Sequence, residues 1–336
     1  MRAAATIAGG IDMVVPFAAI FGQAEDCDRI LMSGLQVLLV AGTHGNEING
    51  PWLLDQWSEP PELLNTHGVG VVPVIGNPEA LALGRRYLDC DLNRSFRLDL
   101  LRSPSILDRE VVRAKQLLSF FGPEGSTPCQ IVIDLHSTTS AMGSTLVVYG
   151  RRPVDLALAA LIQARLGLPI YLHDGDDDQQ GFLVERWPCG LVIEIGPVPQ
   201  GLLKACIIEQ TRLAVQACLE ALSSVASGSP TYYPDQFVVH SHLGSLDLPR
   251  DALGQPAACV HPYLQGRDWQ PLQMGAPLFL RPDGEVFRFE GRDSPIPVFI
   301  NEAAYVEKQI AMSLTCREVC PLPEQWQGAL QQLVGC

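Results

Sequence analysis

A short polar segment at residues 41–47 (AGTHGNE) carries the clearest chemistry in the chain. His44 and Glu47 stand three positions apart, a spacing at which an imidazole nitrogen and a carboxylate oxygen can bind one metal ion. The segment follows the apolar run 35–40 and precedes a helix-like stretch at 48–57. We therefore expect a buried parallel strand that turns into a helix, with both side chains at the edge of the sheet.

A third candidate ligand is His136, which ends the apolar run 131–135 (IVIDL). Asp134 lies two positions earlier, so its side chain points to the same face and can fix the tautomer of the imidazole. The alternative is a hydrogen-bonded histidine without a catalytic role. Two histidines and one carboxylate, with a fourth position open to water, are typical of a catalytic zinc site.

Glu194 is the candidate general base, because it lies within the apolar strand-like run 191–195 (LVIEI). A buried carboxylate is costly unless it is paired or lies at the mouth of the strand. Burial raises the pKa of a carboxylate towards the range that is useful for proton transfer. The alternative is a structural glutamate that pairs with a nearby arginine.

The loop at 85–96 (RRYLDCDLNRSF) concentrates positive charge in a chain whose net charge is −14. Arginine binds a planar carboxylate through two parallel hydrogen bonds, which predicts an anionic substrate near Arg86 and Arg94. We expect Asp89 and Asp91 to orient these guanidinium groups. The alternative is a solvated loop with local ion pairs.

The remaining elements must bring these residues together. Strand-like runs alternate with helix-like runs, which predicts an α/β fold, namely a mainly parallel sheet with helices on both faces. Ligands bind such sheets beyond the carboxyl ends of the strands. The predicted strands are 37–40, 69–75, 131–135, 145–149 and 191–195, and the predicted helices are 48–57, 107–121, 153–166 and 202–223.

The sequence pattern changes after residues 224–232, which we interpret as a linker. Short strand-like pieces at 236–240, 277–280, 286–289 and 297–299 are separated by Pro and Gly. They predict a smaller β-rich domain. The expected organisation is an N-terminal extension at 1–34, a catalytic domain at 35–226 and a C-terminal β-rich domain at 227–336, which the family resemblance described below implies to cap the active site.

Composition narrows the class of protein. With 47% hydrophobic and 18% charged residues, the chain can bury a core. Its acidic charge argues against nucleic acid and against an anionic membrane surface. The 10 Cys residues show no small-domain disulfide framework, so we expect reduced, mostly buried thiols and a cytoplasmic protein. Residues 1–24 resemble a signal peptide only faintly, because Asp12 and two glycines interrupt the apolar run.

Several ordered motifs resemble the aspartoacylase family, within the zinc carboxypeptidase-like group that includes succinylglutamate desuccinylases. The resemblance spans residues from about 35 to about 310. It implies the zinc carboxypeptidase-like fold. The matching motifs are GTHGNE at 42–47, RYLDCDLNRSF at 86–96, DLHSTTS at 134–140, EIGPVPQG at 194–201, HPYLQGRDW at 261–269 and VFINEAAY at 298–305.

The resemblance implies a role for each matching residue. One Zn²⁺ per subunit would be bound by His44, Glu47 and His136. Glu194 would activate the attacking water. The substrate would be held by five residues, namely Arg86, Asn93, Arg94, Tyr305 and Glu194. Arg86 would polarise the acyl carbonyl, and Arg94 would bind the carboxylate on the α-carbon. The implied reaction is hydrolysis of the linear amide bond of an N-acyl-L-amino acid, of the N-acetyl-L-aspartate type, to a carboxylate and a free amino acid.

Two positions depart from the family pattern. Val184 stands where relatives that cleave N-acetylaspartate have an arginine, and Gln180 stands where they have a tyrosine. The acidic loop at 173–180 precedes them, and Arg186 is a possible substitute for the arginine. The alternatives are therefore a deacylase for another acyl group or for an N-acetyl neutral or aromatic amino acid, and a zinc-retaining binding protein without turnover. The family also makes a homo-oligomer plausible.

Overall fold

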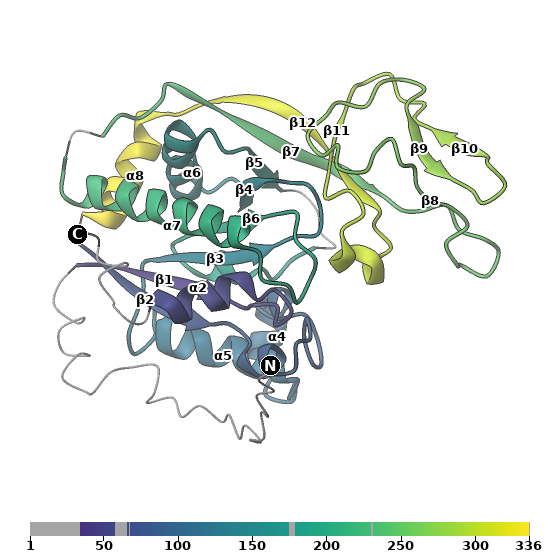
Figure 1. Cartoon of the computed structure of the whole chain (residues 1–336). Helices are drawn as coiled ribbons and strands as arrows, with labels where there is room; N and C mark the ends of the chain where they lie inside the picture. The colour runs from purple at the N-terminus through teal and green to yellow at the C-terminus, as the bar shows by residue number, and fades with distance from the viewer. Residues whose placement is uncertain (1–33, 58–65, 67, 175–178, 230, 336) are drawn as a thin grey trace, which may run out of the picture. The chain divides into compact units, whose positions relative to one another are not determined.

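The computed structural model describes residues 34–57, 66, 68–174, 179–229 and 231–335 (Figure 1). Residues 1–33, nearly all of the predicted N-terminal extension, lie outside this part. Residues Leu35–Cys336 form one compact unit. Within the described residues, no helix is both long and apolar enough to cross a lipid bilayer.

A nine-stranded sheet with the order β11-β12-β7-β5-β4-β6-β3-β1-β2 forms the centre of the fold (Figure 1). The pairs β1–β2, β1–β3, β3–β6, β4–β5 and β5–β7 are parallel, whereas β4–β6, β7–β12 and β11–β12 are antiparallel. This confirms the predicted mainly parallel sheet. The strands are β1 (Leu35–Ala41), β2 (Val69–Ile75), β3 (Ile131–Ser137), β4 (Ser144–Tyr149), β5 (Ile170–His173), β6 (Cys189–Ile195), β7 (Gln236–Leu246), β11 (Ile296–Val298) and β12 (Met312–Pro321).

The register of the central strands sets the position of the polar residues. Strands β1, β3 and β6 are nearly continuous apolar runs, as expected for parallel strands covered on both faces. Val40 pairs with Asp134, and His136 pairs with Glu194. The carboxyl ends of the three strands therefore meet at one edge, with His136 and Glu194 side by side.

Helices cover both faces of the sheet. Helices α2, α6, α7 and α8 share one core with Leu35, Val37 and Leu39 of β1. The side chains of Leu38 and Val40 point to the opposite face of the sheet, because successive strand residues alternate in direction. The buried residues of α5 do not belong to the core that contains α2, α6, α7 and α8. The helical segments are α2 (Asn49–Trp57), α3 (Pro78–Ala82), η3 (Leu92–Arg94), α4 (Leu98–Arg102), α5 (Arg109–Phe121), α6 (Pro153–Leu166), η4 (Leu183–Arg186), α7 (Ala205–Ala226), η5 (Ala303–Lys308) and α8 (Glu324–Val334).

The C-terminal part is rich in strands, as predicted. A second sheet has the order β10-β9-β8, and its strands are β8 (Cys259–Val260), β9 (Pro277–Leu280) and β10 (Val286–Arg288). This sheet packs around its own core, which includes Leu264, Phe279 and Met312. However, β7 and β12 also continue the large sheet, and α8 packs in the core of the first domain. The proposed boundary at residue 226 therefore crosses a continuous sheet and stays a prediction.

Several elements were not anticipated from the sequence, among them β5, β12 and α8. Strand β5 has only four residues. Strand β12 carries polar and charged residues at many of its positions and pairs with β7 and β11 near the margin of the sheet. Helix α8 lies beyond the motifs. The eight described Cys residues are free, but four are buried, fewer than expected.

The loop that carries His44 and Glu47 packs closely on α3. A methyl group on Gly45 would lie 2.2 Å from the backbone of Ala80. We expect Gly45→Ala to displace the loop and to lower the free energy of unfolding by about 1–3 kcal/mol, measured by urea denaturation. Gly328→Ala in α8 is the control, because its added methyl group meets nothing within 4 Å. Equal stability of the two variants would contradict this packing argument.

Candidate active site

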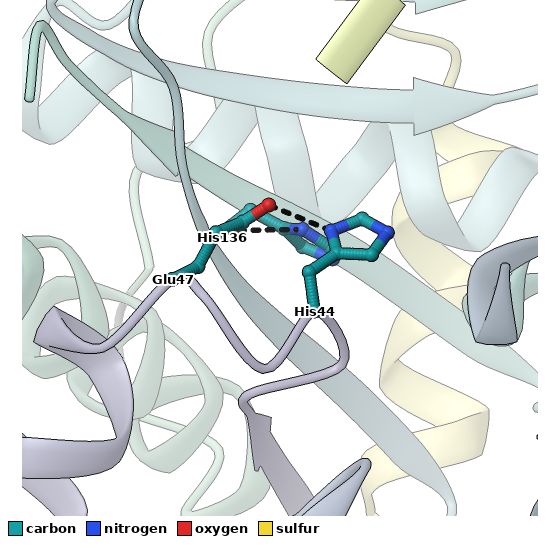
Figure 2. Close-up of side chains that lie close together, drawn as sticks. All are labelled: His44, Glu47 and His136. Atoms are coloured by element: carbon teal, nitrogen blue, oxygen red, sulfur yellow. Dashed lines mark hydrogen bonds and ion pairs between the residues drawn. The ribbon is translucent and has the colours of Figure 1, made fainter. Parts of the chain in front are cut away.

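His44, Glu47 and His136 form a buried group at the carboxyl ends of β1 and β3 (Figure 2). One ligand atom from each residue lies within 4.8 Å of the others. The Nδ1 atom of His44 is 2.7 Å from Oε1 of Glu47, and Nδ1 of His136 is 3.1 Å from Oε2 of the same carboxylate. The structure therefore brings together all three predicted metal ligands.

The outer nitrogen of each imidazole is held by a second carboxylate. Nε2 of His136 lies 2.8 Å from Oδ2 of Asp134, as the sequence predicted, and Nε2 of His44 lies 3.0 Å from Oδ1 of Asp91. Asp134 is fully buried and also accepts a hydrogen bond from Oγ1 of Thr43 at 2.7 Å. These carboxylates fix the ring orientation, so that both Nδ1 atoms face Glu47.

Glu47 is anchored by more than the two histidines. Its Oε2 atom accepts a hydrogen bond from the backbone amide of Ser137 at 2.9 Å, and its Oε1 atom accepts one from Arg86 at 3.4 Å. Burial by itself would raise the pKa of Glu47, but His44 and His136 outweigh it and hold the pKa well below its usual range. Glu47 is therefore an ionised carboxylate. Since Ser137 contributes its backbone amide, its side chain is of little importance to this contact.

Glu194 lies in the wall of the same pocket, beside His136 on the neighbouring strand. Burial raises the pKa of Glu194 well above its ordinary value, and the negative charges of Glu47 and Glu302 raise it further, against the opposing effect of His136. A carboxyl group with a raised pKa next to a metal-ligand set has the properties of a general base that later returns the proton.

The loop between β2 and α5 brings Arg86, Asn93 and Arg94 to the pocket. Arg86 donates to Oδ2 of Asp91 at 3.3 Å, and its Nε atom is buried without a hydrogen-bond partner among the described residues. Arg94 donates to the carbonyl oxygen of Asn93 at 2.7 Å, and its guanidinium lies 4.1 Å from the ring centroid of Phe182. The predicted cationic residues therefore lie at the active edge of the sheet.

The two acidic residues of this loop have different roles. Asp91 orients Arg86, as predicted, and it also binds His44. Asp89 instead accepts a hydrogen bond from the backbone amide of Arg109 at the start of α5, so the predicted contact with the loop guanidinium groups is wrong for Asp89. Glu110 is buried and binds the backbone amides at 88–90, which holds the loop in place.

Tyr305, Phe299 and Glu302 come from the C-terminal part of the chain and line the pocket. Glu302 is buried, and its Oε2 atom accepts hydrogen bonds from Thr138, Thr139 and Ser140, the loop that follows His136. The sequence analysis gave Glu302 no role of its own. A carboxylate two positions after the apolar residues 297–300 was the signal that it is buried and paired.

The positions that depart from the family pattern lie away from the metal-ligand group. Val184 is buried in η4, and Gly190 of β6 packs directly against it. Arg186 and Gln180 line a cavity of about 400 Å³, and Gln180 also lines a larger cavity of about 920 Å³. Residues 175–178 of the predicted acidic loop lie outside the described residues, and Asp174 is paired with Arg151 at 2.6 Å. Arg186 therefore does not enter the pocket of His44, Glu47 and His136.

Comparisons with known proteins agree with this architecture. Residues 33–222 match the family model of the succinylglutamate desuccinylase/aspartoacylase catalytic domain, and residues 235–317 match the AstE/AspA barrel-sandwich hybrid domain. A solved structure of murine aminoacylase 3 is 35% identical, with a TM-score of 0.77 over 85% of this chain and 97% of that chain. The succinylglutamate desuccinylase of Chromobacterium violaceum, 18% identical with a TM-score of 0.57 over 86% of this chain and 85% of that chain, shares the fold.

Curated proteins of Prochlorococcus marinus are also similar to this chain. A protein of Prochlorococcus marinus (strain MIT 9313), described as a probable aspartoacylase, is 96% identical over 305 residues, which cover 91% of this chain and 100% of the relative. The two family models together cover most of the described residues. These matches show that the chain belongs to the succinylglutamate desuccinylase/aspartoacylase family.

Proposed function

We propose that this protein is a zinc-dependent amidohydrolase that removes the acyl group from N-acyl-L-amino acids. The observation that supports this most directly is the position of Glu194 beside the group of His44, Glu47 and His136. A pocket that contains a metal-ligand set, a carboxylate with a raised pKa and two guanidinium groups has the components needed for amide hydrolysis. The family membership and the names of the relatives support the same reaction.

The residues fit a zinc ion. Two imidazole nitrogens and one carboxylate oxygen converge, and each histidine has a carboxylate at its other nitrogen, as is usual for zinc sites. Glu47, Asp91 and Asp134 are all buried within this small volume. A divalent cation offsets such an accumulation of negative charge, and the mixture of nitrogen and oxygen ligands suits zinc better than magnesium or calcium.

Each side chain in the pocket then has its own role in hydrolysis. When bound, zinc supplies the Lewis acidity that polarises the acyl carbonyl and lowers the pKa of a water molecule. Glu194 accepts the proton of the attacking water and afterwards donates it to the leaving amine. Arg86 keeps its Nε donor available for the oxygen of the acyl group, on which negative charge develops. Arg94 binds the α-carboxylate, and Tyr305 closes the pocket over the amino acid.

The size of the pocket favours a small substrate. The cavity around the metal ligands has a volume of about 40 Å³, and Phe299, Glu302 and Tyr305 form one of its walls. A polypeptide chain does not pass through such a space. The name of the Prochlorococcus marinus relative, a probable aspartoacylase, favours N-acetyl-L-aspartate as the substrate. Aromatic residues near Arg94, where Tyr149 stacks on Phe182 at 3.6 Å, instead favour an N-acetyl neutral or aromatic amino acid, which is the second candidate.

A substrate panel tests the proposed reaction. We expect the zinc-loaded protein to release a free amino acid from at least one of N-acetyl-L-aspartate, N-acetyl-L-methionine, N-acetyl-L-tyrosine and N-succinyl-L-glutamate. Amine release would be measured by mass spectrometry, with the metal-stripped protein as the control. Stoichiometric zinc without release from any member of a broad panel would exclude the hydrolase and leave a binding protein.

Substitution of Glu194 tests the assignment of the general base. Glu194→Gln keeps the shape of the side chain but cannot accept a proton, so we expect kcat to fall by at least about 100-fold. The zinc content, measured by atomic emission, should stay at that of the unaltered protein because Glu194 is not a ligand. A variant that keeps its kcat would show that another group takes the proton.

The two aspartates of the loop at 85–96, here called the arginine loop, provide a matched pair of substitutions that test the metal site. Asp91→Asn removes the charge that holds Nε2 of His44, and we expect zinc affinity to fall by about 10- to 100-fold in a competition titration with a chelator. Asp89→Asn, two positions away, affects only the start of α5 and should leave the affinity unchanged. Equal losses in both variants would indicate a general disturbance of the loop.

A further inference from the structure

Lys308 differs from the other lysines of the chain. The sequence contains three, Lys115, Lys204 and Lys308. Nζ of Lys115 donates to the carbonyl of Ser103 at 2.6 Å, and Nζ of Lys204 donates to the carbonyl of Pro197 at 3.2 Å. Nζ of Lys308 is buried and has no hydrogen-bond partner in the part of the chain that the structure describes. A buried ammonium without a partner is unfavourable.

The position of Lys308 is fixed with respect to the active site. It is the last residue of η5, the segment that carries Tyr305, and its Nζ atom lies 5.6 Å from the ring centroid of Tyr305. Glu302 ties the start of η5 to the loop after His136. The hydroxyl of Tyr87 donates to Glu307 at 2.6 Å and ties its end to the arginine loop. Both ends of η5 are therefore attached to segments that form the active site.

Lys308 lines a cavity of about 920 Å³ that shares Arg94 with the much smaller metal pocket. Two described carboxylates line this cavity, and both already have partners: Asp91 binds His44 and Arg86, and Asp174 binds Arg151. Among the described residues that line the cavity, the cations are Arg94, Arg97 and Lys308, against these two carboxylates. Asp91 and the adjacent Glu307 offset part of the charge of Lys308. In a protein with a net charge of −14, this local excess of positive charge indicates an anion.

We propose that Lys308 is a specificity residue that binds the side-chain carboxylate of an N-acyl acidic amino acid. This inference rests on the proposed function. The metal pocket, with a volume of about 40 Å³, is assigned to the scissile bond, and Arg94 at its border is assigned to the α-carboxylate. The rest of the amino acid then extends past Arg94 into the larger cavity, where the flexible stem of Lys308 lets its ammonium reach a second carboxylate.

The electrostatics of Lys308 agree with this role. Burial, together with the positive charges of Arg94 and Arg86, lowers the pKa of Lys308 to about 8, against the opposing effects of Asp91 and Glu307. A carboxylate that binds beside Lys308 removes part of this penalty. The interaction therefore favours substrates with a second negative charge and gives no advantage to neutral side chains.

Kinetics with two substrates test the proposal. For Lys308→Met, we expect KM for N-acetyl-L-aspartate to rise about tenfold, because a charge-assisted hydrogen bond is lost, while KM for N-acetyl-L-methionine stays within about twofold. Lys308→Arg should recover part of the loss, and Lys204→Met is the control for removing a lysine elsewhere. An equal rise for both substrates would overturn the proposal and place Lys308 at the α-carboxylate. An unchanged KM for N-acetyl-L-aspartate would also overturn it.

A binding measurement separates this proposal from the proposed function. Reductive ¹³C-methylation labels the three lysines of the zinc-loaded Glu194→Gln protein, and the signal of Lys308 is identified by its absence in the additional variant Lys308→Met. We expect N-acetyl-L-aspartate to shift this signal, and N-acetyl-L-methionine to leave it in place. The result does not depend on turnover, so it stands even if hydrolysis fails. A signal that responds to neither compound, or equally to both, would contradict the role of Lys308.

Discussion

The active site depends on the cost of burying negative charge. Glu47, Asp91, Asp134 and Glu302 are buried at or beside the pocket, and an ionised carboxylate is tolerated there only with strong partners. Glu47 takes partners from β3 and from the arginine loop, and Glu302 takes them from the loop after β3. Each carboxylate thus links segments that are distant in sequence, and the need to satisfy it fixes the arrangement of the pocket.

The sheet makes this arrangement possible because parallel neighbours end at the same edge. Strand β3 lies between β1 and β6, so that the loop after β1 delivers His44 and Glu47 next to His136, while β6 delivers Glu194 beside it. A shift of one residue between β3 and β6 would turn Glu194 to the opposite face of the sheet. The apolar residues of β6 would fit either face, since helices cover both. What opposes such a shift is the Glu194 carboxylate, which would move from the pocket into an apolar core.

The sequence predicted the elements that hold the metal ligands, because a polar residue at the end of an apolar strand is a strong signal. His44, Glu47, His136 and Glu194 belong to this class. It did not distinguish Asp89 from Asp91, because the difference arises from the packing of α5 against the loop. Strand β12 was missed for a similar reason. Its polar residues become strand positions only when β7 and β11 pair with it.

Substrate selection depends on different parts of the structure from those that bind the metal. The ligands are set by strand ends, whereas the surroundings of the substrate side chain are set by how η4, η5 and the arginine loop pack together. Val184 illustrates this, since its contact with Gly190 keeps it away from both the metal pocket and the adjoining cavity. Val184 therefore supplies no charge to either space. Preference must instead come from charges that line the cavity, and these belong to segments that meet only in the folded protein.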